Sequence, residues 1–313
     1  MLEQKSVQNK INVKVIGIGG GGNNAVTRII NDNVKNIETY LLNTEISILK
    51  RANTKNVLQI GKETTKGLGA GANEVIGEKS ALESKKEIKE ILQGTDMLFL
   101  TAGMGGGTGT GVIPVVAETA KIMNILTVGI VTKPFTFEGR KRTLRADKGI
   151  EKLKENVNAL IVVSNDNLLK IVGDKTSIVE AFELADSILK QGIQSITDII
   201  TTVGEINVDF ADVQAIFNYK GKAYMGIGQA DTVENAVKKA IDNPLTDNTI
   251  DTAKGVIFNV RGGSKLGLND INQAIKIIND RVDADANIMF GTVIDEKLED
   301  KIIVTVIATG IEE

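Results

Sequence analysis

The most constraining feature of the sequence is a glycine-rich stretch, Gly103–Gly111, in which six of nine residues are glycine. An apolar run at 97–100 precedes it and is typical of a buried strand, and residues 112–123 follow with a helical pattern. Glycines at this density are costly in backbone entropy unless the chain needs positive φ or a close approach to a ligand. A flexible linker is the plain alternative, but linkers favour polar surroundings. A strand, a glycine loop and a helix N-terminus therefore predict an anion site, most often one for phosphate.

The composition narrows the chemistry. The 313 residues include no cysteine and no histidine, which excludes disulfides, thiolate nucleophiles, Ser-His catalysis and ordinary zinc sites. A polar segment at 1–10 and the lack of any run near ~18 apolar residues argue against direct membrane insertion. The net charge of -3 gives no reason to expect nucleic acid as a partner. We expect a cytoplasmic protein that uses carboxylates, hydroxyls, amides and Lys/Arg, with a bound Mg²⁺ or monovalent ion and no metal assigned to protein ligands.

A second glycine loop follows the strand expected at 11–18 and leads into a helix at 25–30. Gly17, Gly19 and Gly22 satisfy the spacing of the dinucleotide fingerprint. That fingerprint also requires an acidic residue at the end of the next strand, at 38–42, but this strand ends in Asn43. Neither loop contains the Gly-Lys-Ser/Thr of a Walker P-loop. A dinucleotide-dependent oxidoreductase is therefore the weaker of two interpretations.

Strands alternate with helices along the first half of the chain. Further strands are expected at 56–60, 125–132 and 159–163, and helices at 80–93 and from 135 onward. This alternation predicts a doubly wound, mostly parallel sheet, whose ligands lie beyond the carboxyl ends of the strands. The three glycine loops, the third at 67–73, map to that edge together with Glu138, Arg142 and Asn165.

A long helix is predicted at 176–203, because apolar residues recur there in steps of three and four. It would be about 42 Å long at 1.5 Å per residue. The pattern then changes. Strands are expected near 223–228, 255–260, 288–294 and 301–308, and helices at 232–241 and 269–281. These elements predict a second, smaller α/β domain around a mixed four-stranded sheet. We therefore expect an extension at 1–10, a nucleotide-binding domain at 11–175, the central helix at 176–203, and a C-terminal domain at 204–313.

With these loops in place, the chain resembles the tubulin/FtsZ family of GTPases, and within it FtsZ, the tubulin homologue of bacterial cell division. The resemblance extends over about 13–310 and is carried by the signature at 105–111, Gly-Gly-Gly-Thr-Gly-Thr-Gly, and by the motifs at 66–73, 131–135, 137–140 and 207–212. It implies a Rossmann-like GTPase domain, GTP and GDP as ligands, and subunits that stack head to tail with GTP between neighbours. It also implies a role in the division ring and division-ring proteins as partners, although the tail peptide that binds membrane tethers in the family does not follow Glu313.

The resemblance also implies roles for individual residues. Phosphates would be held by Gly20, Gly21, Gly22, Asn23 and Asn24 and by Gly103, Gly105, Gly106, Gly107, Thr108, Gly109 and Thr110. Ala70, Gly71 and Ala72 would lie near the γ-phosphate, Glu138 and Arg142 near the ribose, and Asn43 at the adjacent strand end. Guanine would be recognised by Asn165, Phe182 and Asp186, and hydrolysis activated by Asn207, Asp209 and Asp212.

The residue types support the guanine assignment independently. Guanine presents two adjacent donors, N1-H and the 2-amino group, which the Asp186 carboxylate can accept as a pair. Phe182, one turn earlier, offers a ring to stack on the base. The plain alternative makes Phe182 a core residue and Asp186 a solvated helix charge.

Asp209 and Asp212 lie beyond the other end of the central helix, about 35–40 Å from the guanine residues by the same helical rise. They cannot reach the γ-phosphate bound by their own subunit, but they could reach that of the next subunit in a head-to-tail filament. Alternatively, Asp209 caps a helix and Asp212 is a first-turn charge, and both roles are compatible with catalysis. A GTP-binding regulator that does not polymerise is a third hypothesis.

Two positions depart from the family pattern. Glu74 follows Asn73 where the family commonly has proline, which predicts a less rigid loop near the γ-phosphate. The segment 201–205, Thr-Thr-Val-Gly-Glu, replaces a common Arg-Pro-Gly segment before the catalytic loop. The rigidity of that hinge and the turnover rate are therefore the properties on which this chain is expected to differ.

Overall fold

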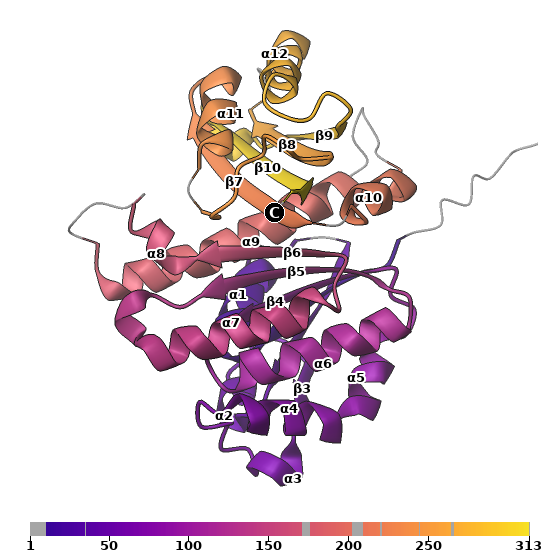
Figure 1. The fold of residues 1–313 in the computed structure, drawn as a ribbon, viewed down its shortest axis with the longest axis vertical. Helices are drawn as coiled ribbons and strands as arrows, with labels where there is room; N and C mark the ends of the chain where they lie inside the picture. The colour runs from indigo at the N-terminus through magenta and orange to yellow at the C-terminus, as the bar shows by residue number, and fades with distance from the viewer. Residues whose placement is uncertain are drawn as a thin grey trace, which may run out of the picture.

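The computed structural model describes residues 11–34, 36–170, 176–201, 209–219, 221–243, 245–263 and 266–312. One layer is a six-stranded sheet of order β3-β2-β1-β4-β5-β6, in which all neighbouring strands are parallel (Figure 1). Its strands are β1 (Val13–Ile18), β2 (Ile37–Asn43), β3 (Val57–Gln59), β4 (Met97–Gly103), β5 (Leu126–Lys133) and β6 (Ala159–Ser164). The predicted parallel α/β sheet is confirmed.

Helices cover both faces of this sheet, because its strands carry apolar residues on both sides. In β1, Val13 and Val15 belong to the core on one face, whereas Ile16 and Ile18 belong to the core on the other. The first face is covered by α1 (Gly19–Asn31), α2 (Ile46–Lys50) and α9 (Ile178–Thr201). The second is covered by α4 (Glu74–Glu83), α5 (Lys85–Leu92), α6 (Thr108–Ile122) and α7 (Arg140–Lys154). Shorter segments are α3 (Lys62–Thr65), η1 (Thr136–Glu138) and α8 (Asn165–Leu168).

The long helix α9 lies between the two sheets of the molecule (Figure 1). Its buried residues Leu189, Ile193 and Ile196 share one core with Ile130 of the first sheet and with Met225 of the second. The predicted central helix is thus present, and the part of the prediction beyond Thr201 lies outside the described residues. Because one core includes residues of both sheets, α9 packs against both of them.

The second sheet has four strands in the order β7-β10-β8-β9, and it is mixed. Strand β10 is antiparallel to both neighbours, whereas β8 and β9 are parallel. The strands are β7 (Lys222–Ala230), β8 (Gly255–Gly262), β9 (Asn287–Ile294) and β10 (Ile302–Ile311). Helices α11 (Val233–Ile241) and α12 (Leu268–Asn279) cover its outer face, and α10 (Phe210–Phe217) and η2 (Glu296–Leu298) complete the unit.

Two predicted helices differ from the structure. The helix expected from 135 onward starts only at Arg140, because Gly139, with a φ of 99°, separates η1 from α7. The other is the helix expected at 80–93. In place of a single helix at 80–93, α4 ends at Glu83 and α5 starts at Lys85. Ser84 interrupts the helix because its hydroxyl accepts a hydrogen bond of 2.9 Å from the Gly61 amide, which holds this buried residue against the neighbouring loop. The preceding residue, Glu83, accepts hydrogen bonds from the amides of Glu63 and Thr64 at the start of α3.

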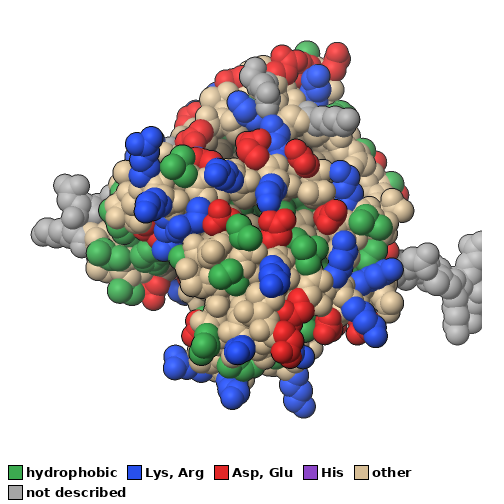
Figure 2. Space-filling model, turned by 60° about the horizontal axis from the view of Figure 1, so that its bottom comes forward, with side chains coloured by type: hydrophobic (Ala, Val, Ile, Leu, Met, Phe, Trp, Pro, Cys, Tyr) green, Lys and Arg blue, Asp and Glu red, His purple; other side chains and the backbone are tan. Residues whose placement is uncertain are grey.

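The surface carries charges of both signs. Figure 2 shows Lys/Arg and Asp/Glu side chains interspersed over the face formed largely by the first domain, in keeping with the net charge of -3. Among the helices that the structure describes, none combines the length and apolar character that crossing a membrane demands.

Candidate functional site

The two glycine loops meet at the centre of the first sheet. Strands β1 and β4 are neighbours, and the chain continues from β1 toward one edge of the sheet and from β4 toward the other. In such sheets, ligands bind at this point of reversal, beyond the carboxyl ends of the strands. A Cβ on Gly19 would come within 2.9 Å of the Gly109 amide nitrogen, so the loops are in direct contact.

Helices α1 and α6 begin at this contact. The structure begins α1 at Gly19 and α6 at Thr108, so glycines that the sequence suggested as loop residues form the first helical turns. The N-cap residues, Ile18 and Gly107, supply no side-chain hydrogen bond to these turns. The first amides of a helix lack intrahelical partners and carry a partial positive charge. Two such helix ends at one place form a favourable environment for a polyanion.

A cavity of about 350 Å³ lies in front of these helix ends. Predicted site residues make up most of its lining: Gly20, Gly21, Asn24, Gly103, Gly106, Gly107, Thr108, Gly109, Glu138, Arg142, Asn165, Phe182 and Asp186. Sequence reasoning missed four lining residues, Met104, Thr132, Pro134 and Ala185. Three of them could have been found, because Met104 lies within the glycine stretch and Thr132 and Pro134 lie at the end of the strand predicted at 125–132.

Two lining glycines have no explanation within the protein. No described atom lies within 4 Å of a Cβ built on Gly20 or Gly106, and neither residue has a positive φ. Packing and backbone conformation therefore both permit a side chain at these positions. A ligand that comes close to the backbone explains the glycines, because a Cβ would occupy the space that it fills.

The cavity lining also carries an amide oxygen that is unpaired within the described part of the chain, that of Asn165, and the carboxylate of Asp186. Asn165 is buried, and its Oδ1 has no hydrogen-bond partner among the described residues. Burial raises the pKa of Asp186 to about 6, against the opposing effects of the Arg28 guanidinium and a hydrogen bond from Asn24. An unpaired acceptor and a partly desolvated carboxylate in one cavity are suited to a ligand with several N–H donors.

An aromatic cluster lies beside these groups. The ring of Phe182 is 39% exposed and meets Phe135 edge-on with centroids 5.3 Å apart, and Phe135 stacks on Phe137 at 4.9 Å. Phe182 is therefore held by aromatic contacts on one side while it lines the cavity. The interpretation of Phe182 as a core residue and Asp186 as a solvated charge does not fit this arrangement.

Glu138 and Arg142 form an ion pair at the cavity wall, with 3.1 Å between Arg142 Nε and Glu138 Oε2. The other oxygen of Glu138 accepts a bond from the Phe135 amide, which fixes the carboxylate. Glu138 is thus a pre-oriented acceptor, since both of its oxygens are held by donors from the same short segment.

Several predicted residues lie behind the cavity wall instead of lining it. Asn23 donates to the carbonyl of Gly17 and accepts from Asn43 at 2.7 Å, so these two amides connect the ends of β1 and β2. The Thr110 hydroxyl accepts a bond from the Gly105 amide and holds the glycine loop closed. Gly22 and Ala70 are buried, and Gly71 and Ala72 are exposed with positive φ.

Asp209 and Asp212 lie at the start of α10 and do not line the cavity. Figure 1 shows α10 at the opposite end of α9 from α8. The 24 residues of α9 alone span about 36 Å at 1.5 Å per residue. Asp209 is the N-cap of α10, accepting a bond of 3.3 Å from the Ala211 amide, and Asp212 lies in the first turn, so the capping interpretation is confirmed. The third residue of the predicted loop, Asn207, lies outside the described residues.

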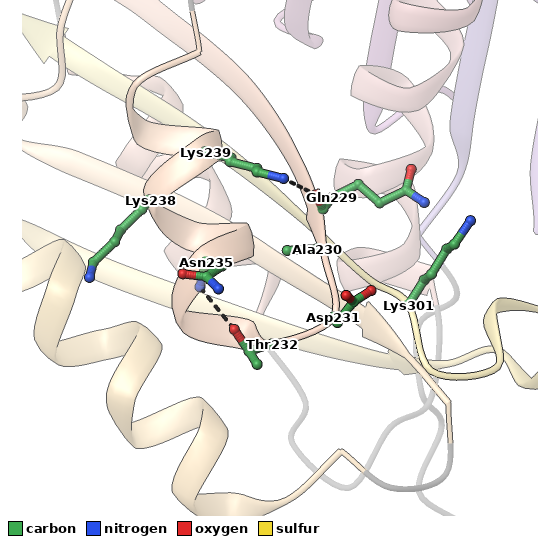
Figure 3. Close-up of a pocket in the computed structure, with 8 residues that line it drawn as sticks. All are labelled: Gln229, Ala230, Asp231, Thr232, Asn235, Lys238, Lys239 and Lys301. Carbon is green, nitrogen blue, oxygen red and sulfur yellow. Dashed lines mark hydrogen bonds between the residues drawn. The ribbon is translucent and has the colours of Figure 1, made fainter.

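Larger cavities lie elsewhere and contain none of the predicted site residues. One of about 660 Å³ lies on the C-terminal unit (Figure 3). Two of its lysines already have partners: Lys239 donates to the carbonyl of Gln229, and Lys238 pairs with Glu234. In the part of the chain that the structure describes, no group of three or more acidic side chains is placed to hold a metal ion.

The chain is similar to known proteins over most of its length. Residues 12–173 match the family model described as the tubulin/FtsZ family, GTPase domain, and residues 221–312 match that of the FtsZ family, C-terminal domain. An FtsZ dimer structure from M. jannaschii is 41% identical, covers 97% of this chain and 89% of its own, and superposes with a TM-score of 0.94. CetZ1 from Haloferax volcanii, a GDP-bound monomer, is 20% identical over 97% of this chain and 95% of its own, with a TM-score of 0.81, and shows the shared fold. The chain therefore belongs to the tubulin/FtsZ family of GTPases and has the FtsZ-like fold.

Proposed function

We propose that this protein hydrolyses GTP at the junctions of a head-to-tail homopolymer that acts in cell division, in the cytoplasm at the division site. One observation carries the proposal: the anion cavity and the aspartates Asp209 and Asp212 lie at opposite ends of α9. A head-to-tail contact brings the tail of one subunit onto the cavity of the next, and it generates an open filament when the rotation does not close.

The cavity fits GTP at both of its ends. The uncapped ends of α1 and α6 and the open space at Gly20 and Gly106 suit the phosphates. Asp186 would accept from guanine N1-H and the 2-amino group, Asn165 Oδ1 is free to accept a further donor, and Phe182 would stack on the base. Adenine lacks the pair of adjacent donors, so this site favours GTP over ATP.

Hydrolysis requires a group that orients the attacking water. Among the described residues that line the cavity, the carboxylates are Glu138, which is paired with Arg142, and Asp186 on α9, to which we assign the ribose and the base. Asp209, Asp212 and Asn207 of the next subunit would orient or deprotonate the water, and the amides of the glycine loops would stabilise the phosphoryl charge. A Mg²⁺ ion, or a monovalent cation, held through the phosphates would neutralise part of that charge.

Glu74, which stands where the family commonly has proline, lies at the start of helix α4. Asn73 is the N-cap of α4 and its Oδ1 accepts a bond of 3.0 Å from the Val75 amide, while Glu74 is the first helical residue. An acidic residue in the first turn is favourable to the helix dipole. We infer that this cap fixes the end of the γ-phosphate loop where proline does so in other family members.

Structures of relatives support self-association. The M. jannaschii FtsZ was solved as a dimer, and CetZ2 from Haloferax volcanii, with a fold like that of this chain at 18% identity and a TM-score of 0.81, was solved as a GTPgS-bound protofilament. Division-ring proteins are the further partners that we propose for this chain.

The test is the GTPase rate per subunit as a function of protein concentration, with light scattering recorded in parallel. The rate should rise with concentration, and it should collapse in Asp212→Ala while GTP binding survives. Gln214→Ala, on the same helix, is the matched control and should retain activity. A rate that does not depend on concentration would contradict the shared site and favour a GTP-binding regulator that does not polymerise.

A further inference from the structure

A segment of the C-terminal unit, residues 245–248, bridges the second sheet and the candidate guanine site. It is anchored to β7 at both ends. Asn248 Nδ2 donates to the carbonyl of Ala223 at 3.0 Å, and Asn243, just before the segment, donates to the carbonyl of Ile227. The Leu245 amide in turn donates to Asn243 Oδ1 at 3.0 Å. The 245–248 segment therefore keeps a fixed position relative to β7.

The same segment is bonded to the short helix α8 of the first domain. The Ser164 amide donates to the Leu245 carbonyl at 3.1 Å, and Asn167 Nδ2 donates to Asp247 Oδ1 at 2.8 Å. The side chains of Leu245 and Leu168 are buried in one core. Polar and apolar contacts thus join the 245–248 segment to both ends of α8.

In the sequence, Asn165 lies between Ser164 and Asn167, the two residues that make these hydrogen bonds. It is the first residue of α8, follows Ser164 directly, and lines the cavity with an unpartnered Oδ1. Helix α8 has only four residues and follows β6, an edge strand of the sheet. One helical turn has little stability of its own. Its orientation, and with it the direction of the Asn165 amide, depends on the contacts that hold it from outside.

We propose that Asp247 is a positioning residue for guanine recognition: through Asn167 it orients α8 so that Asn165 meets the base. The C-terminal sheet is thereby coupled to the base end of the nucleotide site, because the 245–248 segment is fixed to β7. This inference rests on the proposed GTP site and adds a residue from the other domain to it. Asp247 does not touch the ligand.

The test measures GTP and ITP affinity by competition with a fluorescent GTP analogue, at protein concentrations below those that give light scattering. Inosine lacks the 2-amino group, so the ratio of the two affinities reports how well the guanine donors are recognised. Asp247→Ala should weaken GTP binding about threefold to tenfold, the value of one hydrogen bond, and lower the GTP/ITP ratio. Asp247→Asn keeps an acceptor oxygen and should restore both, and Thr249→Ala, an exposed neighbour, should change neither.

A double-mutant cycle with Asn165→Ala separates the possible outcomes. If Asp247 acts through Asn165, Asp247→Ala should have no further effect on the GTP/ITP ratio once Asn165 is alanine. Additive effects, or an unchanged ratio in Asp247→Ala, would overturn the positioning role while leaving the GTP site intact. If Asn165→Ala itself leaves GTP affinity unchanged, the guanine assignment fails instead. Asn167→Ser removes the same bond from the other side and should reproduce the lower ratio if Asp247→Ala does not fold.

Discussion

At the scale of single residues, the carboxyl of Asp186 makes the most specific prediction. Burial in the cavity raises its pKa to about 6, and the proposed paired bond to guanine requires the ionised form. GTP affinity should therefore fall as the pH drops from 8 to 5, by about tenfold for each unit below the pKa. The control is Asp186→Asn, whose side chain cannot titrate. The pH dependence of its GTP affinity shows the contribution from protonation of GTP itself. Equal pH profiles for the two proteins would contradict the role of Asp186.

The same pKa has an effect of opposite sign on the stability of the nucleotide-free protein. Because the folded pKa lies above the ordinary aspartate value of 3.8, the folded state binds the proton more tightly than the unfolded state. The contribution of Asp186 to the free energy of unfolding is present at low pH and is lost as the pH rises through about 6. Asp186→Asn should therefore melt above wild type at pH 7.5, and the difference should shrink at pH 4, as measured by thermal unfolding without nucleotide.

Gly20 and Gly22 differ in what surrounds an added side chain: the space beside Gly20 is open, whereas protein atoms fill the space beside Gly22. Gly20 has no described atom within 4 Å of an added Cβ, whereas a Cβ on Gly22 would lie 2.3 Å from the Thr101 carbonyl oxygen. Gly20→Ala should leave the free energy of unfolding unchanged or raise it by up to about 1 kcal/mol, because alanine is the better helix former. It should nevertheless weaken GTP binding. Gly22→Ala should unfold at lower denaturant concentration, and a Gly20→Ala variant with wild-type affinity would remove the ligand argument for that glycine.

At the scale of elements, α9 and the second sheet are joined by polar contacts that include an ion pair. Asp198 on α9 pairs with Arg261 on β8, and Ser195 bonds Thr305 on β10 at 2.9 Å. Burial raises the pKa of Asp198, and Arg261 opposes that shift. The ion pair therefore offsets part of the cost of desolvating this half-buried carboxylate at the boundary between the two units.

Arg261→Ala should lower the free energy of unfolding by roughly 1–3 kcal/mol, because it leaves the Asp198 carboxylate buried without its partner. The loss should be larger at pH 8 than at pH 5, since protonation neutralises the unpaired group. Urea denaturation of this variant is compared with that of Arg261→Ala/Asp198→Asn, which should recover part of the stability. If the double variant is no more stable than the single one, the unpaired charge is not the cause.

Sequence patterns predicted the regular elements well, because buried strands and amphipathic helices carry their own periodicity. They failed where tertiary contacts decide the local structure. Ser84 breaks the predicted 80–93 helix through its bond to Gly61, a partner 23 residues away that no local pattern indicates. The glycines at 19–22 form the first turn of α1 although glycine disfavours helix, and the close contact that requires glycine at Gly22, with the Thr101 carbonyl, comes from another strand. The bond between Asn167 and Asp247 was equally invisible, since neither residue belongs to a motif.

At the scale of the whole molecule, the two sheets are not independent. One core contains residues of β5, α9 and β7, and the 245–248 segment adds polar bonds between the domains. The shared core joins the cavity and the α10 aspartates into one structural unit. A filament with one nucleotide per junction requires such a unit, because each subunit must offer a cavity at one end and carboxylates at the other.

This arrangement predicts complementation between two inactive variants. Asp212→Ala keeps the cavity but lacks a carboxylate that we propose to be catalytic, and Gly106→Val keeps the carboxylates but fills the open space in the cavity. Neither should hydrolyse GTP alone. In an equal mixture, roughly one quarter of randomly formed junctions pair an intact cavity with an intact Asp212, so GTPase activity should reappear. The control is Asp212→Ala mixed with Asp212→Ala/Gly106→Val, in which no junction is complete. If the first mixture stays as inactive as this control although light scattering shows assembly, the cavity and the aspartates do not meet across a subunit junction.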